Sequence, residues 1–60
     1  MPVISLETST LRKEQKQQLV EEFTETASRI LNLSKSTIVV YLKENSTENI
    51  GAGGKLLSEG

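Results

Sequence analysis

The second residue of the chain, Pro2, is the first whose residue type could do chemistry. An initiator methionine is generally removed when proline follows it, and loss of Met1 would leave a secondary amine on a rigid ring. An α-amino group has an unperturbed pKa near roughly 8, and burial or nearby cations lower it further, so such an amine suits general-base work at neutral pH. While Met1 is attached, the same nitrogen is an amide without basicity. Taken alone, however, Pro2 is better explained as the ordinary start of an edge strand, where proline is tolerated, than as a catalytic residue.

Other common catalytic residues are missing or have a simpler interpretation. The sequence has no His and no Cys, which excludes a Ser-His-Asp or Cys-His arrangement and any imidazole or thiolate metal site. We interpret Glu21, Glu22 and Glu25 as the solvated face of a helix. The glycine-rich segment 51–55 lacks the spacing of a phosphate-binding loop, because Leu56 stands where Ser or Thr is required. This segment therefore predicts a turn or a small hairpin.

A strand followed by a helix must position Pro2. Apolar and polar residues alternate over residues 2–8, which predicts a strand. Ser9 and Thr10 are the candidate N-caps of a helix over residues 12–31, where apolar residues recur every three or four positions. Asn32 tolerates a left-handed backbone and is the predicted helix stop. The apolar positions of the predicted helix are Leu19, Val20, Phe23, Ala27, Ile30 and Leu31.

A second strand is predicted over residues 37–44, which are rich in β-branched and aromatic side chains. One of its faces is apolar, and Val39 and Tyr41 make the other face largely apolar as well, as in a strand covered on both sides. The crossover helix of a right-handed βαβ unit covers only one face of the sheet. We therefore expect another copy of the chain to cover the second face.

Composition describes a single small domain, residues 1–60. A chain of this size buries only about 60% of the surface that its unfolded form exposes, and without cysteines or a metal site it needs association for support. Seven basic and eight acidic residues give a net charge of −1, which argues against nucleic acid or an anionic membrane as partner. No apolar run approaches the roughly 18 residues of a membrane span, and no leader pattern is present. We expect a cytoplasmic protein.

Several segments together resemble the 4-oxalocrotonate tautomerase family. The resemblance covers nearly the whole chain and rests on the start Met-Pro-Val-Ile, Glu14-Gln15-Lys16, Ser28-Arg29, Ile38-Val39-Val40 and the stretch Asn49-Ile50-Gly51-Ala52-Gly53-Gly54-Lys55. It implies an α/β (α+β) fold: a single βαβ unit with parallel strands and a short C-terminal glycine-rich hairpin. In that family such units pair into four-stranded sheets and assemble into hexamers, as trimers of dimers.

The resemblance also implies an activity. The N-terminal proline of the family, here Pro2, moves a proton between carbons of an unsaturated 2-oxo or 2-hydroxy acid, such as 2-hydroxymuconate or phenylenolpyruvate, without cofactor or metal. Arg12 lies ten residues after Pro2, the spacing of the family's carboxylate-binding arginine. Val39 stands where the best-known members carry a second arginine, and Ile50 where they carry an aromatic residue. Tyr41, two residues beyond Val39, is a candidate hydrogen-bond donor to substrate.

Two other functions fit the same residues. Protonated Pro2 could assist hydration or dehalogenation of an unsaturated acid, as in some members of the wider superfamily. Alternatively, a non-catalytic oligomeric binding protein could have kept the scaffold after losing the second arginine or the free amine of Pro2. Retention of Met1 would favour the binding protein.

Overall fold

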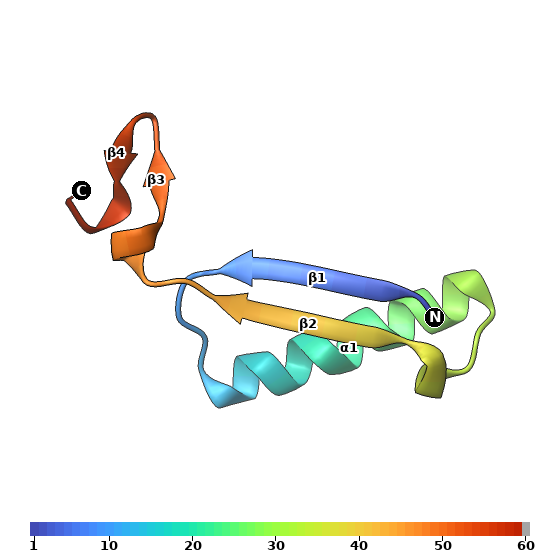
Figure 1. Ribbon diagram of the computed structural model, residues 1–60. Helices are drawn as coiled ribbons and strands as arrows, with labels where there is room; N and C mark the ends of the chain where they lie inside the picture. The colour runs from blue at the N-terminus through green and yellow to red at the C-terminus, as the bar shows by residue number, and fades with distance from the viewer. Residues whose placement is uncertain (60) are drawn as a thin grey trace.

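The computed structural model describes residues 1–59 and consists of a βαβ unit followed by a small hairpin (Figure 1). Strand β1 (Val3–Thr8) leads into helix α1 (Lys13–Leu31), which returns the chain to the start of strand β2 (Val39–Glu44). The two strands pair in parallel and α1 lies across one face of the two-stranded sheet. The predicted fold class and the parallel arrangement of the strands are confirmed.

The ends of α1 are set by local hydrogen bonds. The N-cap is Arg12, so the prediction that Ser9 or Thr10 caps the helix is wrong. A guanidinium has no acceptor to offer the first helical amides; instead, Gln15 Oε1 accepts a hydrogen bond from the Arg12 N–H at 2.9 Å. At the other end Asn32 adopts a left-handed conformation with φ of 55°, which confirms the predicted stop.

Strand β2 begins two residues later than predicted. Residues Lys35–Thr37 form a single 3₁₀ turn, so that Thr37 belongs to this turn and not to the strand. Ser34 causes this turn, because its hydroxyl accepts a hydrogen bond from the Ser36 N–H at 3.3 Å and its carbonyl accepts one from the Thr37 N–H at 3.0 Å. Such local bonds compete with sheet pairing. The next residue is Ile38. Within residues 1–59 it is the only hydrophobic residue that is buried, with 9% of its surface exposed.

The core lies between α1 and the sheet and is small. Leu6 and Leu42 are half-buried while the residues on either side of them in the strands are exposed, and α1 contributes the half-buried Leu19, Phe23 and Ala27. Val20, Ile30 and Leu31 were expected on the same apolar side of α1 but are 39%, 67% and 51% exposed. The last two lie in the final turn of the helix, beyond the cover of the sheet.

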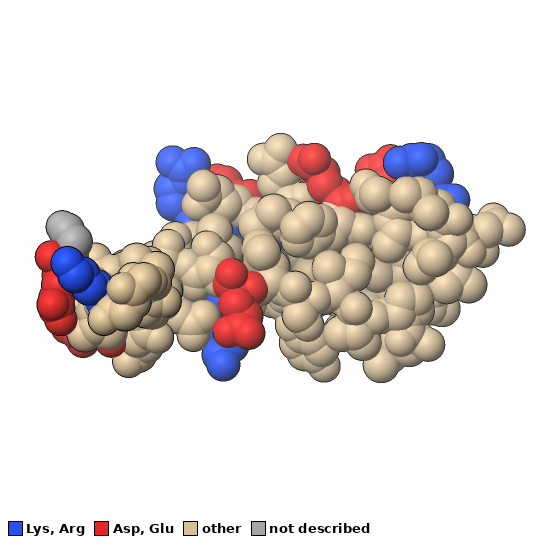
Figure 2. All heavy atoms as spheres, turned by 90° about the horizontal axis from the view of Figure 1, so that it is seen from above, with Lys and Arg blue, Asp and Glu red and all other residues tan. Residues whose placement is uncertain are grey.

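The opposite face of the sheet has no cover in the single chain. Val3 is 51% exposed and Tyr41 is 59% exposed, and Val3 lies beside Val39 in the parallel register. Figure 2, which shows the molecule of Figure 1 from above, has a broad uncharged area over the βαβ unit, with most charged groups toward its margins and the hairpin. The side chains of β2 thus present apolar surface on both faces, as the sequence pattern indicates.

The C-terminal hairpin stands away from the βαβ unit (Figure 1). Strands β3 (Gly51–Ala52) and β4 (Lys55–Leu56) pair antiparallel. The two residues between them, Gly53 and Gly54, have φ of 63° and 82°, as a two-residue primed turn requires. The predicted glycine hairpin is confirmed. The projecting hairpin makes the chain 43 Å long, and its radius of gyration of 14.5 Å exceeds the value of about 10 Å for a compact chain of this length.

Candidate active site

Pro2 lies directly before β1, at the end of the sheet where β2 begins. Its ring is half-buried, and its carbonyl accepts a hydrogen bond from the Val39 N–H at 3.0 Å. Met1, by contrast, is 86% exposed, so the peptide bond that joins it to Pro2 is at the surface of the single chain. The structure therefore brings Pro2 and Val39 together. While Met1 is attached, the Pro2 nitrogen is an amide and cannot act as a base.

Arg12 lies at the opposite end of the sheet. It follows β1, and the N–H of its neighbour Leu11 donates to Glu44, the last residue of β2. Glu44 in turn is the register partner of Thr8, the last residue of β1. Because β1 has six residues and a strand rises about 3.3 Å per residue, Pro2 and Arg12 are separated by about 20 Å along the sheet. One chain does not bring these two candidate residues together.

Ile50 belongs to the Arg12 end of the sheet. It lines a hollow between the βαβ unit and the hairpin, together with Thr8 and Ser9 at the end of β1. Tyr41 lies midway along β2, on the uncovered face beside Ser5. Pro2 and Val39 thus form one group at the start of the sheet, and Arg12 and Ile50 form a second group at its end. The remaining residues that line the hollow are Glu7, Asn45, Asn49 and Leu57.

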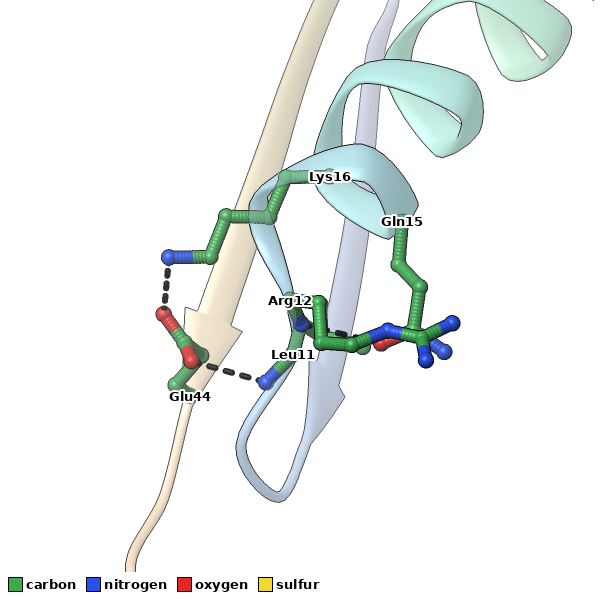
Figure 3. Close-up of polar contacts among 5 residues, drawn as sticks. All are labelled: Leu11, Arg12, Gln15, Lys16 and Glu44. Atoms are coloured by element: carbon green, nitrogen blue, oxygen red, sulfur yellow. Dashed lines mark hydrogen bonds and ion pairs between the residues drawn. The ribbon is translucent and has the colours of Figure 1, made fainter.

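A carboxylate at the end of β2 holds the start of α1 (Figure 3). Glu44 Oε2 accepts a hydrogen bond from the Leu11 N–H at 2.9 Å, and Glu44 Oε1 pairs with Lys16 Nζ at 2.6 Å. We call Glu44, Leu11 and Lys16 the Glu44 clamp. Sequence reasoning missed it, because Glu44 has the appearance of an ordinary polar strand end and its partner Leu11 lies 33 residues away in the chain. No local pattern signals such a contact.

The backbone of Arg12 is fixed on both sides while its side chain extends outward. Its N–H donates to Gln15 Oε1 at 2.9 Å, and its carbonyl accepts from the Lys16 N–H at 3.0 Å. Figure 3 shows the guanidinium running past Gln15, away from Glu44. Within residues 1–59 no carboxylate forms an ion pair with it. Arg12 therefore offers five N–H donors to an anion from outside the chain.

The Glu44 clamp predicts a small dependence of stability on pH. The hydrogen bond from Leu11 and then the contact with Lys16 hold the pKa of Glu44 below its ordinary value of 4.5. Because the folded pKa is the lower one, the stabilisation is complete above pH 4.5 and disappears as the pH falls through the folded pKa. At fixed chain concentration, we expect the native protein to need more urea for unfolding than Glu44→Gln at pH 7, and this difference to shrink below pH 4. A difference that stays constant down to pH 3 would contradict the clamp.

The acidic residues of α1 lie where the sequence places them. Glu21, Glu22 and Glu25 are exposed, and Glu22 Oε2 accepts a hydrogen bond from Gln18 Nε2 at 2.6 Å. Their interpretation as a solvated face is confirmed. In the described part of the chain no three His, Cys, Asp or Glu side chains gather into a group that could hold a metal ion. No helix within residues 1–59 combines the length and apolarity needed to cross a membrane.

Proteins with similar sequences include probable tautomerases. Residues 2–60 match the tautomerase enzyme family. A probable tautomerase of Campylobacter jejuni is 37% identical over 57 residues, which cover 92% of this chain and 84% of that protein. A probable tautomerase of Helicobacter pylori is 43% identical over 42 residues, which cover 70% of this chain. The match spans 62% of the length of the Helicobacter protein.

Solved structures of the same family share the fold. A crystal structure of a 4-oxalocrotonate tautomerase homologue superimposes with a TM-score of 0.93 at 34% identity, covering 100% of this chain and 97% of the other. The structure of DmpI from Helicobacter pylori gives a TM-score of 0.86 at 32% identity, covering 97% of this chain and 98% of that one. The βαβ unit with its parallel strands and short hairpin is thus an architecture that this chain shares with these proteins. By sequence and by fold, this chain belongs to the tautomerase family.

Proposed function

We propose that the chain is a cofactor-independent isomerase that interconverts the enol and keto forms of an unsaturated 2-oxo or 2-hydroxy acid, with Pro2 as the catalytic base after removal of Met1. The observation that carries the proposal is the position of Pro2. It follows an exposed Met1, and the Val39 N–H fixes its carbonyl at 3.0 Å. Removal of Met1 would create a secondary amine held in place by the sheet.

The proposed reaction is a proton transfer. The Pro2 amine takes a proton from the enol form, and the resulting ammonium returns a proton to a carbon of the substrate. Negative charge spreads over the substrate oxygens between these steps. A guanidinium such as that of Arg12 binds the substrate carboxylate through two parallel hydrogen bonds and stabilises this charge where water is excluded.

We further propose that each site is built from more than one copy of the chain. Pro2 and Arg12 lie about 20 Å apart along the sheet, which is too far for a single small acid to touch both. A second copy placed on the uncovered sheet face would bury Val3 and Tyr41, which are 51% and 59% exposed. It could also carry its Arg12 to the Pro2 of the first copy. The family resemblance favours a hexamer, a trimer of dimers.

The residues that would line a site shared between copies, Val39 beside Pro2 and Ile50 beside Arg12, favour a substrate with one carboxylate. Val39, the residue hydrogen-bonded to Pro2, offers no charge to a second carboxylate, and Ile50 offers an aliphatic surface. An apolar or aromatic tail therefore suits these positions better than an anionic one. We propose Val39 and Ile50 as residues that contact the tail, and Tyr41 as a hydrogen-bond donor from the uncovered face. Phenylenolpyruvate fits this description better than 2-hydroxymuconate.

The test is an ultraviolet assay of enol-to-keto conversion on protein whose intact mass shows that Met1 is absent. We expect kcat/KM for phenylenolpyruvate to exceed that for 2-hydroxymuconate by about tenfold, the effect of one charge-assisted hydrogen bond. Turnover of neither substrate by protein that lacks Met1 would refute the proposal. Water addition or halide release from unsaturated acids would then identify the hydratase or dehalogenase alternative. Saturable binding without turnover would identify a binding protein.

A further inference from the structure

The Glu44 clamp connects the end of β2 to the segment that carries Arg12. We define residues 9–12 as the Arg12 loop. Of residues 9–11, only Leu11 makes a hydrogen bond to another element within residues 1–59, and its partner is Glu44 at 2.9 Å. The second oxygen of the same carboxylate contacts Lys16 Nζ, in the first turns of α1, at 2.6 Å. One side chain thus holds the loop and the helix that follows it.

These contacts hold the backbone from which the Arg12 side chain extends. Leu11 is the residue before Arg12, and Lys16 donates its backbone N–H to the Arg12 carbonyl at 3.0 Å. Glu44 therefore holds the residue before Arg12 and the side chain of the residue whose N–H bonds to the Arg12 carbonyl, but leaves the guanidinium without a partner from residues 1–59. An arginine held in this way loses little backbone freedom when it binds an anion, which is the benefit of preorganisation.

The clamp is poorly suited to a purely stabilising role. The side chains of Lys16 and Glu44 are 42% and 33% exposed, and ion pairs in contact with water contribute little to stability. Its chief physical effect is therefore on the geometry of the Arg12 loop. From this arrangement we infer that Glu44 is a positioning residue, which holds Arg12 ready for the substrate carboxylate through Leu11 and Lys16. The inference rests on the carboxylate-binding role proposed for Arg12.

The test is a double-mutant cycle with cinnamate as probe, an unsaturated monocarboxylate without an enol. Dissociation constants are measured by calorimetry on the full chain, and KM and kcat for phenylenolpyruvate are measured in parallel. We expect Glu44→Ala to weaken cinnamate binding about tenfold and to raise KM to a similar degree. The effect on kcat should stay within about twofold, because Glu44→Ala leaves the guanidinium itself in place to stabilise the developing charge once the substrate is bound.

The coupling with Arg12 separates positioning from a general loss of structure. If Glu44 acts through Arg12, then Glu44→Ala added to Arg12→Ala causes no further weakening. Glu44→Gln keeps an acceptor for the Leu11 N–H and should retain most of the affinity. Glu21→Ala removes the same charge from an exposed position of α1 and serves as the matched control, with unchanged binding.

Additive effects of Glu44→Ala and Arg12→Ala would overturn the inference, and so would equal weakening by Glu21→Ala or a native protein that does not bind cinnamate. The proposed function can fail separately. A native protein that binds cinnamate with the expected coupling but leaves phenylenolpyruvate unchanged would support the positioning role of Glu44 and refute the isomerase.

Discussion

Replacement of Pro2 by alanine is expected to lower kcat/KM for phenylenolpyruvate by at least about 100-fold, the lower end of what a positioned general base contributes. Methionine is also removed ahead of alanine, so the variant presents a primary amine without the ring that fixes its direction. The fold should be preserved, because the contact of residue 2 with the sheet is made by its carbonyl, which accepts from the Val39 N–H at 3.0 Å. Steady-state rates on protein of known intact mass measure the effect.

A chain with an uncleaved extension before Pro2 is the stricter comparison. Its residue 2 remains proline, but the nitrogen is an amide, and we expect no turnover above the uncatalysed rate. Cleavage of the extension to expose Pro2 should then restore activity in the same sample. If the extended chain were as active as the trimmed one, Pro2 would not be the base.

A mixture of two inactive variants is expected to regain activity. Pro2→Ala lacks the proposed base and Arg12→Ala lacks the proposed carboxylate ligand, and in a single chain these residues lie about 20 Å apart along the sheet. If each site takes Pro2 from one copy and Arg12 from another, then random co-assembly of equal amounts leaves about a quarter of the sites with both native residues. Activity near this fraction of the native value, after joint unfolding and refolding, would show a shared site.

Two comparisons complete the mixing experiment. When the two variants are refolded separately, mixed and assayed immediately, we expect no gain in activity, because their subunits have not exchanged. Sedimentation should show that native protein and both variants have the same assembly. If co-assembled samples of normal size regained no activity, Pro2 and Arg12 of different copies would not act in one shared site. A native protein that sediments as a stable monomer would contradict the shared site directly.

The fold was predictable where the signal is local. Alternation over β1, the three- and four-residue spacing in α1, the left-handed Asn32 and the paired Gly53 and Gly54 each depend on neighbours within a few positions. The errors have local causes too. Arg12 became the N-cap although its side chain has no acceptor, because Gln15 supplies one from within the helix. Ser34 bonds to the residues after it and so delays the start of β2.

The candidate site was less predictable, because its geometry depends on topology and on contacts far apart in sequence. Parallel pairing of β1 and β2 puts Pro2 at one end of the sheet and the Arg12 loop at the other, a consequence that sequence spacing alone does not reveal. The contact between Leu11 and Glu44 spans 33 residues and joins a backbone amide to a side chain, which leaves no pattern to recognise. The residue types suggested the chemistry, whereas only the structure shows that Pro2 and Arg12 of one chain lie far apart.

The dimensions of the chain have a further consequence. A body 43 Å long and 14 Å across in its thinnest direction leaves only Ile38 as a buried hydrophobic residue in its described part. The free energy that holds such a thin slab together must come largely from surfaces that the isolated chain leaves open to water. Where association supplies that energy, stability rises with the logarithm of concentration. Dilution would then act on this fold much as urea acts on an ordinary globular domain.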